Sequence, residues 1–522
     1  MPSTPLLERD FATYGELARE NARDRGGHPA LVHDGRTLNH GELDALMDRV
    51  AAALQRDGVA PREVIAICAA TSLDYAALFL GALRAGVAVA PLAPSSTAGS
   101  LAGMLANAQA RIVFVDAETA ARLAPLQERI AAPFVALEGE AFETWLAPPG
   151  ARPAFVDIEP DAPFNLIYSS GTTGTPKGIV QPHRMRWGHV VRARAHGYGP
   201  DAITLVSTPL YSNTTLVSFF PAVMLGGTAV LMARFDAGRY LDLAERHRVT
   251  HAMLVPVQYR RLMAHPDFDG HDLSSFRMKF CTSAPFAAEL KAEVLRRWPG
   301  GLIEYYGLTE GGGTLVLKAH ERPDKLATVG QPAPGHDIRL IDDAGREVGP
   351  GEIGEVVGRS ELMMTGYHRQ PDKTVEAEWF APDGRRFIRT GDIGRFDAEG
   401  FLTLVDRKKD MIISGGFNIY PSDLEAVLAC HPAVLEAAVV GVPSAQWGET
   451  PVAYVVPRPE AGERAPSEEA LREWANARLG KTQRLAALHF LDSLPRSAIG
   501  KVLKRELRER PRQEGEEWVR GR

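Results

Sequence analysis

The chain has 522 residues, of which 45% are hydrophobic and 24% charged, a composition that predicts a globular protein with two or more domains. Its formal net charge is −6 with both signs mixed along the chain, which argues against a nucleic-acid-binding protein. The stretch Met1–Asp10 has no signal-peptide pattern and no apolar run is long enough to span a bilayer, so we expect a cytoplasmic protein without a transmembrane segment.

The first part of the chain alternates between helix-like and strand-like segments. Runs with helical periodicity are separated by short apolar runs of strand length. The expected helices are 42–54, 74–84 and 100–108, and the expected strands are 64–68, 87–91 and 110–115. This order is typical of βαβ units, so we predict a parallel sheet with helices packed on its faces.

A loop rich in glycine and hydroxyl side chains follows a short apolar strand at 164–168. It reads Ser169-Ser-Gly-Thr-Thr-Gly-Thr-Pro-Lys177-Gly178. Glycines let backbone N–H groups approach phosphate oxygens, hydroxyls add donors, and Lys177 adds a positive charge. Pro176 stands where a Walker loop has glycine, so we expect an ATP-phosphate loop of another design; a solvent-exposed linker is the alternative.

The alternation of strands and helices resumes beyond this loop. The expected strands are 203–208, 228–232, 251–255 and 276–281, with helical segments between them. We therefore predict a second sheet in the same large domain, packed with the first around a shared core. Cys68, Cys281 and Cys430 lie in apolar segments without metal or disulfide spacing, and we expect reduced core residues.

The character of the sequence changes twice after Gly330. Short strands at 338–342, 354–358 and 401–405, separated by turn residues, predict a small β subdomain. From Lys408 the pattern is α+β; the expected helices are 422–430, 467–479 and 501–508, and the expected strands are 435–440 and 452–456. The predicted fold class is α/β, with a large N-terminal domain at 1–406 and a small α+β C-terminal domain at 407–522. The large domain would hold two βα-wound sheets and the small β subdomain.

Four further clusters carry residue types that suit nucleotide chemistry. In Tyr305-Tyr-Gly-Leu-Thr-Glu310, rings can stack on a purine, a hydroxyl can bond a phosphate, and a carboxylate can hold Mg²⁺. In Arg389-Thr-Gly-Asp392, a carboxylate can accept hydrogen bonds from both hydroxyls of a ribose. The others are Asp406–Phe417 and Pro495–Lys501. Taken singly, each cluster is better explained as a turn or a solvated surface.

Taken together and in this order, the loop and the four clusters resemble the core motifs of the adenylate-forming superfamily. That superfamily includes acyl-CoA synthetases, the adenylation domains of peptide synthetases, and luciferases. The likeness runs from about Leu38 to Lys501 and is strongest to the coumarate and fatty-acyl ligases of the acyl-CoA synthetase branch. It implies adenylation of a carboxylate by ATP, then thiol attack with release of AMP. It also implies a mobile C-terminal domain that rotates between the two steps.

The resemblance implies roles for individual residues. The β- and γ-phosphates of ATP would meet Ser169, Ser170, Gly171, Thr172, Thr173, Gly174 and Lys177. The adenine would lie among Ser283, Ala284, Pro285, Tyr305, Tyr306 and Gly307. Thr309 would contact the α-phosphate, Glu310 would hold Mg²⁺, and Asp392 with Arg407 would bind the ribose. Lys501 would bridge the carboxylate and the α-phosphate during adenylation.

The resemblance also implies a tunnel for the thiol. Lys409 stands where such proteins hinge between domains. Gly415 and Gly416 would leave room for a pantetheine arm. Trp447 is a candidate contact for coenzyme A, with a core tryptophan as the alternative.

The segment Thr208–Thr215 resembles the part of the family that lines the acyl pocket. It has Ser212 where many relatives have histidine, which puts a guarding role of that histidine in doubt, and no aspartate for an amino-acid ammonium. Asn213 stands where some hydroxybenzoate-activating relatives have an asparagine that reads a ring hydroxyl. The expected pocket residues are Tyr211, Ser212, Asn213, Thr214, Gly311 and Gly312. Because the glycines leave volume, we predict a roomy apolar pocket for a hydrophobic monocarboxylic acid, either medium-chain, cyclic or aryl.

The leading hypothesis is therefore an acyl-CoA synthetase that uses ATP, Mg²⁺ and coenzyme A, with small molecules as partners and a monomeric or homodimeric state. One alternative is a freestanding enzyme that loads an acyl or aryl group onto a carrier protein. A luciferase-like monooxygenase and a binding protein without catalysis are the others; filled catalytic positions argue against the last.

Overall fold

The computed structural model describes residues 5–169, 176–414, 417–444, 447–458, 466–480, 483–496 and 502–510. The chain separates into two compact units. The first comprises Met1–Ile338 and Gly358–Ile388, and the second comprises Arg339–Val357 and Arg389–Arg522. The domain boundary between residues 406 and 407 stays a prediction.

The first unit contains a seven-stranded sheet in the order β18-β8-β7-β4-β3-β5-β6. Its strands are β3 (Val64–Cys68), β4 (Ala88–Pro91), β5 (Val113–Val115), β6 (Phe134–Ala136), β7 (Pro163–Ser169), β8 (Lys177–Pro182) and β18 (Gly366–Tyr367). The strands from β6 to β7 along this order are parallel, whereas β8 and β18 join as antiparallel neighbours. The connecting helices are α2 (His40–Arg56), α3 (Leu73–Arg84), α4 (Ala98–Ala108), α5 (Ala117–Leu123) and α6 (Gly139–Trp145). Because helices cover both faces of such a sheet, strand β3 is buried at every residue.

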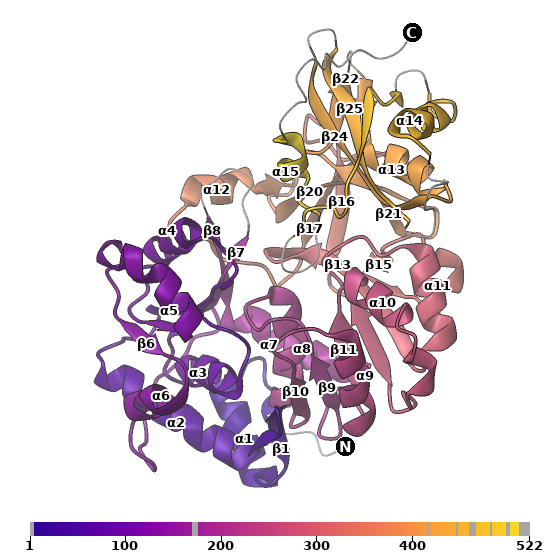
Figure 1. The fold of residues 1–522 in the computed structure, drawn as a ribbon. Coiled ribbons are helices and arrows are strands. Elements are labelled where there is room, and N and C mark those ends of the chain that lie inside the picture. The colour runs from indigo at the N-terminus through magenta and orange to yellow at the C-terminus, as the bar shows by residue number, and fades with distance from the viewer. Residues whose placement is uncertain are drawn as a thin grey trace. The chain divides into compact units, whose positions relative to one another are not determined.

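The first unit also contains a nine-stranded sheet in the order β15-β14-β13-β12-β11-β9-β10-β1-β2. Its strands are β1 (Pro29–His33), β2 (Arg36–Asn39), β9 (Ile203–Val206), β10 (Thr228–Leu231), β11 (His251–Leu254), β12 (Met278–Cys281), β13 (Gly301–Leu308), β14 (Gly311–Lys318) and β15 (Gln331–Pro332). The helices are α1 (Tyr14–Arg25), α7 (His183–Ala193), α8 (Asn213–Met224), α9 (Ala237–Arg246), α10 (Pro256–Met263) and α11 (Ala288–Arg297). In Figure 1, α9, α10 and α11 lie on one side of strands β9 to β13, and α7 and α8 lie on the other.

One hydrophobic core joins the two sheets of the first unit. It includes Ile67 of β3 and Phe114 of β5 as well as Leu231 of β10 and Ile303 of β13. An aromatic cluster lies within this core, with the ring of Phe164 on β7 5.3 Å from that of Phe220 on α8, edge to face. Each such pair stabilises by about 0.5–1.5 kcal/mol beyond its buried area. The expectation of two sheets packed around a shared core is therefore confirmed.

Helices α1 and α2 begin at side chains that satisfy their free N–H groups. Thr13 accepts a hydrogen bond from the backbone N–H of Glu16, and the Glu16 carboxylate accepts one from the backbone of Thr13. Asn39 and Glu42 make the same reciprocal pair at the start of α2. Such a capping box explains why both helices begin where they do.

A five-stranded sheet has the order β16-β17-β20-β19, with β21 paired to β20. Its strands are β16 (Asp337–Ile341), β17 (Gly354–Arg359), β19 (Glu378–Phe380), β20 (Arg386–Phe396) and β21 (Leu402–Arg407), and helix α12 (Pro371–Glu376) precedes β19. In β16, β17 and β20 the chain runs from one unit into the other.

The second unit contains another five-stranded sheet, in the order β23-β22-β25-β24 with β26 paired to β25. Its strands are β22 (Ile412–Ser414), β23 (Phe417–Ile419), β24 (Val434–Ser444), β25 (Gly448–Pro457) and β26 (Ala487–Phe490). The helices are α13 (Pro421–Ala429), α14 (Glu468–Asn476) and α15 (Lys504–Arg508). Its core contains Ile412, Leu424, Val439 and Leu471.

The α/β fold class is confirmed, with a large N-terminal part and a smaller α+β part. One detail of the sequence analysis is wrong: Cys430 is exposed just after the end of α13, whereas Cys68 and Cys281 are buried as expected. Within the described residues, no helix combines the length and the hydropathy that a membrane span needs.

Candidate active site

The predicted phosphate loop joins two antiparallel neighbours, β7 and β8. Ser169 pairs with Lys177 across the ladder, and Tyr168 pairs with Gly178. Glycine is favoured at 178 because a Cβ there would lie 3.1 Å from the Tyr168 ring. The remaining predicted loop residues, Ser170, Gly171, Thr172, Thr173 and Gly174, lie outside the described residues, as does the side chain of Ser169.

Tyr367 on β18 brings two of the predicted site residues together. Its hydroxyl donates a hydrogen bond to Glu310 Oε1 at 2.8 Å, and Lys177 Nζ lies 5.2 Å from the centre of its ring. Burial raises the pKa of Tyr367, and the neighbouring Glu310 carboxylate raises it further, so the hydroxyl remains a donor. Lys177 and Glu310, which lie far apart in the sequence, therefore meet around one aromatic ring.

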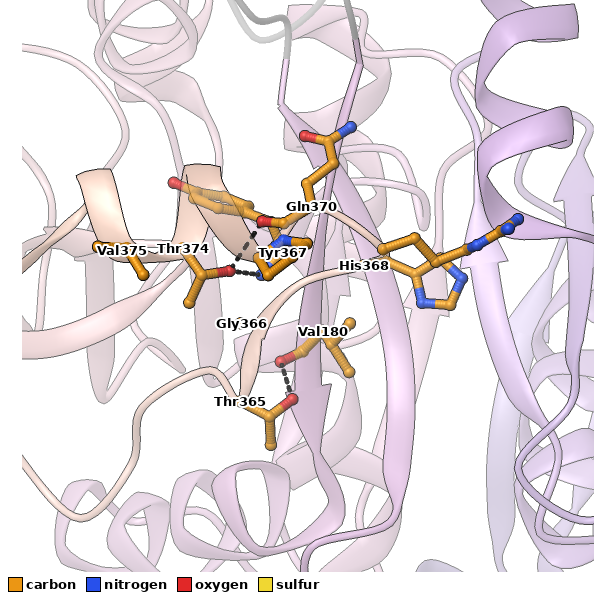
Figure 2. Close-up of a pocket in the computed structure, with 10 residues that line it drawn as sticks. Val180, Thr365, Gly366, Tyr367, His368, Gln370, Thr374 and Val375 are labelled. Carbon is orange, nitrogen blue, oxygen red and sulfur yellow. Dashed lines mark hydrogen bonds between the residues drawn. The ribbon is translucent and has the colours of Figure 1, made fainter.

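A cavity of about 490 Å³ lies on the segment that carries Tyr367. Its wall is formed by β8, β18 and α12, and includes Val180, Tyr367, His368 and Thr374. Figure 2 shows Thr374 against the turn after β18, where Thr374 Oγ1 accepts from the Tyr367 N–H at 2.9 Å and donates to the Gln370 carbonyl at 3.1 Å. These bonds fix the backbone on either side of Tyr367.

Thr309 and Glu310 form the turn between β13 and β14. The carbonyl of Glu310 accepts a hydrogen bond from the Met364 N–H at 2.8 Å. Gly311 and Gly312 follow with φ of +78° and +80°, a conformation that favours glycine.

Neighbouring backbone occupies the places where side chains on Gly311 and Gly312 would lie. A Cβ on Gly311 would overlap the Leu362 carbonyl, and one on Gly312 would lie 2.9 Å from the Gly358 carbonyl. The glycines therefore allow close packing of the chain, and the roominess that the sequence analysis inferred from them has no support here. Gly311 and Gly312 as pocket residues stay predictions.

Of the predicted adenine walls, 283–285 follows strand β12, and 305–307 lies within its parallel neighbour β13. Ser283 comes after β12 with φ of +82°, which is uncommon for a residue with a side chain. Successive residues of β13 face opposite sides of the sheet, so the adjacent rings of Tyr305 and Tyr306 separate. The Tyr305 ring stacks on Phe280 in the core at 5.8 Å between centroids. Of the two tyrosines, Tyr306 is thus the one on the face away from Phe280.

The predicted acyl segment lies against the predicted adenine wall. Helix α8 begins at Asn213, directly after the half-buried Tyr211 and the buried Ser212. The hydroxyl of Thr214, in the first turn of α8, forms a hydrogen bond with the hydroxyl of Ser283. Segments predicted to bind the acid and the adenine are therefore in direct contact.

A buried network of amides connects the acyl segment to the Thr309 turn. Gln181 Nε2 donates to the Thr309 carbonyl at 2.6 Å and to Asn213 Oδ1 at 3.3 Å. Arg186 Nη2 donates to Asn213 Oδ1 at 2.8 Å, and Arg186 Nε donates to Asn165 Oδ1 at 3.0 Å. Burial lowers the pKa of Arg186 to about 10, so the guanidinium is still charged at neutral pH.

The second unit holds the remaining described candidates. Asp392 on β20 is buried and pairs in register with Arg407 on β21, whose Nε lies 3.0 Å from Asp392 Oδ1. Burial lowers the pKa of Lys409. The backbone N–H of Trp447 donates to Ser444 Oγ at 3.3 Å. Gly415, Gly416 and Lys501 lie outside the described residues.

Tyr367 and three residues of the amide network, Asn165, Gln181 and Arg186, were not predicted from the sequence, whereas Asn213 was an expected pocket residue. Tyr367 follows a glycine between two expected strands, where an aromatic residue gives no specific signal. Asn165 and Gln181 each stand alone in apolar strands, a pattern that indicates a buried polar partner without saying which one. An arginine such as Arg186 on a helix is ordinarily solvated, and nothing in the sequence marks this one as buried.

Comparison with known proteins gives two family matches. The family described as AMP-binding enzyme matches residues 18–368, and that described as AMP-binding enzyme C-terminal domain matches residues 423–501.

Individual relatives match over nearly the whole chain. The fatty acid–[acyl-carrier-protein] ligase ScoC of Streptomyces coeruleorubidus is 34% identical over 498 residues, which cover 92% of this chain and 93% of the relative. A feruloyl-CoA synthase of an Amycolatopsis species is 34% identical over 492 residues, covering 92% and 95%. The crystal structure of ATP-bound MatB from Rhodopseudomonas palustris is similar with a TM-score of 0.85 and 28% identity, covering 95% of this chain and 99% of that one.

Proposed function

The chain belongs to the AMP-binding enzyme family, and we propose that it joins a hydrophobic monocarboxylic acid to the thiol of coenzyme A at the expense of ATP. It is an AMP-forming acid–thiol ligase, a class that uses ATP and coenzyme A. The specific acid and the roles of individual residues are the proposal.

The first half-reaction makes the acid reactive. A carboxylate oxygen of the acid attacks the α-phosphorus of ATP, the bond to the β-phosphate oxygen breaks, and pyrophosphate leaves with that electron pair. Two anions must approach each other, so positive charge and N–H donors are needed where they meet. Lys177 and the residues around Ser169–Gly174 would hold the departing phosphates, Thr309 would contact the α-phosphate, and Lys501 would neutralise charge on the carboxylate.

The residue types around Glu310 fit a magnesium ion. Mg²⁺ prefers one or two carboxylates together with substrate phosphates. The Tyr367 hydroxyl occupies one oxygen of Glu310, and the described residues make no hydrogen bond to the other. Glu310 would hold the ion, which when bound would supply positive charge to the phosphates.

One observation carries this proposal more than any other. Gln181 Nε2 donates one hydrogen bond to the Thr309 carbonyl, on the predicted phosphate side, at 2.6 Å. It donates another to Asn213 Oδ1, on the predicted acyl side, at 3.3 Å. Adenylation requires the carboxylate and the α-phosphate to meet within bonding reach. A single amide that contacts both predicted subsites supports that arrangement.

In the second half-reaction the thiol sulfur attacks the carbonyl carbon of the acyl adenylate, a thioester bond forms, and AMP leaves with the oxygen. We propose that Asp392 and Arg407 hold the ribose, and that Tyr306 with Ser283, Ala284 and Pro285 holds the adenine. Lys409 would be the hinge, and Gly415, Gly416 and Trp447 would line the path of the pantetheine arm.

A second acceptor has specific support. ScoC is described as loading fatty acids onto an acyl-carrier protein, and it is as similar to this chain as the feruloyl-CoA synthase is. A carrier protein and coenzyme A present the same pantetheine thiol, so the chemistry of the acid site does not separate them. Loading of a carrier protein is therefore the alternative function.

The test is thioester formation with each acceptor. Pyrophosphate release would be measured over a panel of medium-chain, cyclic aliphatic and aryl acids, and the active acids would then be supplied with coenzyme A or with a purified pantetheinylated carrier protein. Acyl-CoA formation at a higher kcat/KM than carrier loading is the expected result. Efficient carrier loading with negligible acyl-CoA would establish the alternative. A monomeric or homodimeric state and a cytoplasmic location stay predictions.

A further inference from the structure

Arg186 is a buried cation with no counter-charge among the residues that the structure describes. Its side chain is 0% exposed, lies 5.8 Å from the rings of both Phe164 and Phe220, and pairs with no carboxylate among the described residues. A buried charge is ordinarily paired, because its removal from water costs several kcal/mol. Here the hydrogen-bond acceptors for the guanidinium are the neutral side-chain amides of Asn165, Gln181 and Asn213.

An arginine fixes the direction of every amide that it contacts, because a guanidinium donates five hydrogen bonds and accepts none. Asn165 Oδ1, Gln181 Oε1 and Asn213 Oδ1 must therefore be the atoms that face Arg186. The rest of the network agrees with this assignment. Asn165 Nδ2 donates to Gln181 Oε1 at 2.9 Å, which leaves Gln181 Nε2 to donate to Asn213 Oδ1 and the Thr309 carbonyl.

These hydrogen bonds also fix the orientation of the side-chain amide of Asn213, the first residue of α8 in the predicted acyl segment. Its Oδ1 accepts from both Arg186 and Gln181, so its Nδ2 points away from them. This Nδ2 has no hydrogen-bond partner among the described residues, and it is not closed off in the interior, since the side chain is only half-buried. The side chain therefore offers N–H donors, and no acceptor, to whatever lies beside it.

The charge of Arg186 strengthens this preference. Hydrogen bonds in a chain polarise one another, and a cation on the oxygen of an amide makes its N–H groups better donors. A buried positive charge next to the acyl segment also favours an electron-rich neighbour and disfavours an ammonium group.

We propose that Arg186 is a positioning residue that turns Asn213 into an obligate hydrogen-bond donor of the acyl site, so the preferred acid carries an acceptor oxygen where it meets Asn213. This inference rests on the proposed function and narrows it: a ring or chain with a carbonyl, ether or phenolic oxygen is preferred over a purely hydrocarbon one. An acid with a donor-only substituent in that place would leave two donors facing each other and would be rejected.

The test compares acids that differ by one oxygen in place of one methylene. Cinnamic acids with a methoxy or an ethyl group at each ring position form one series, and octanoic acid with its single-ether analogues forms the other. The readout is the ratio of kcat/KM for pyrophosphate release, ether over methylene. The wild type should favour the ether by about tenfold at one position, because the methylene leaves the Asn213 donor unpaired.

Three variants separate positioning from simple structural support. Asn213→Asp keeps the shape, but its carboxylate can bond Arg186 with one oxygen and turn the other, an acceptor, toward the acid; the tenfold ratio should fall to one or below. Arg186→Met should lower the ratio part of the way, since Gln181 still donates to Asn213. Asn39→Asp is the matched control: this side chain accepts from the Glu42 N–H at 2.8 Å at the start of α2, and a carboxylate does so equally well.

The outcomes distinguish this inference from the function on which it rests. If no acid in either series supports pyrophosphate release, the proposed function fails. If acids react but no position shows an ether preference, or if Asn213→Asp leaves the ratio unchanged, the function stands and the inference is wrong. If Arg186→Met folds and keeps the full ether preference, the positioning role of Arg186 is wrong. Should Arg186→Met fail to fold, Asn213→Asp still decides whether Asn213 acts as the donor, and an unchanged ratio overturns the inference.

Discussion

Replacement of Tyr367 by phenylalanine tests whether the Glu310 carboxylate must be held in one orientation. The Tyr367 hydroxyl lies 2.8 Å from Glu310 Oε1 and is kept protonated by burial, so it donates to a carboxylate. A hydrogen bond to a charged group contributes about 1.5–3 kcal/mol, and about 1.4 kcal/mol corresponds to a factor of ten. We therefore expect Tyr367→Phe to lower kcat/KM for adenylation about ten- to a hundredfold.

The assay is acid-dependent pyrophosphate release at a series of Mg²⁺ concentrations. Because the loss of activity in Tyr367→Phe acts through Glu310, this variant should also need a higher Mg²⁺ concentration than the wild type for its half-maximal rate. Tyr198→Phe is the matched control, since the Tyr198 hydroxyl lies 2.9 Å from a neutral partner, Ser218 Oγ, in the core. If Tyr367→Phe stays within about twofold of the wild type and its Mg²⁺ dependence is unchanged, the orientation argument is refuted.

Three further predictions address the chemistry and the stability of the fold. Lys501→Ala should remove several kcal/mol of transition-state stabilisation from adenylation and spare thioester formation from pre-made acyl adenylate; an equal loss in both steps, followed as pyrophosphate and thioester, would contradict the assigned role. Lys291→Met should lower the free energy of unfolding in urea by about 3–5 kcal/mol, because it leaves the buried Glu304 carboxylate unpaired. The double variant with Glu304→Gln should regain most of the lost stability. If Lys291→Met alone loses no stability, the pair is not buried. Burial lowers the pKa of His183 and of His251 to about 4, below the ordinary value of 6.5, so the unfolded chain takes up protons first. Stability should therefore be complete above about pH 6.5 and fall toward pH 4; a urea midpoint that stays constant between about pH 7 and 5 would contradict this.

The element order could be predicted because buried parallel strands are continuous apolar runs. Strand β3 spans Val64–Cys68, which agrees with the expectation at both ends. The expected strand at 203–208 is too long by its last two residues, since β9 ends at Val206. Ser207 and Thr208 are still buried beyond that end. Burial and ladder pairing are separate properties, and the sequence pattern reports only burial.

The family could be predicted from the motifs taken as a set, but the contacts of the residues in those motifs could not. The residue types of the Tyr305–Glu310 cluster are visible in the sequence, whereas the contacts made by Gln181, Arg186 and Tyr367 depend on segments that are far apart in the chain. A polar residue in an apolar strand indicates that a partner exists, and only the packing of the sheets identifies it.

Glycine was interpreted too simply. Gly311 and Gly312 were expected to leave volume for the acid, but the carbonyls of Leu362 and Gly358 approach the places where their side chains would lie. A glycine can mark an open pocket or a close backbone contact, and the sequence does not distinguish the two.

The central claim, that the acid is activated as an adenylate, has one direct test. An acid labelled with ¹⁸O in both carboxylate oxygens would be turned over with ATP and coenzyme A, and the products separated for mass spectrometry. Attack of the carboxylate on the α-phosphorus predicts that one labelled oxygen appears in AMP and none in pyrophosphate. Label in inorganic phosphate with ADP as the other product, or AMP without label, would contradict the account.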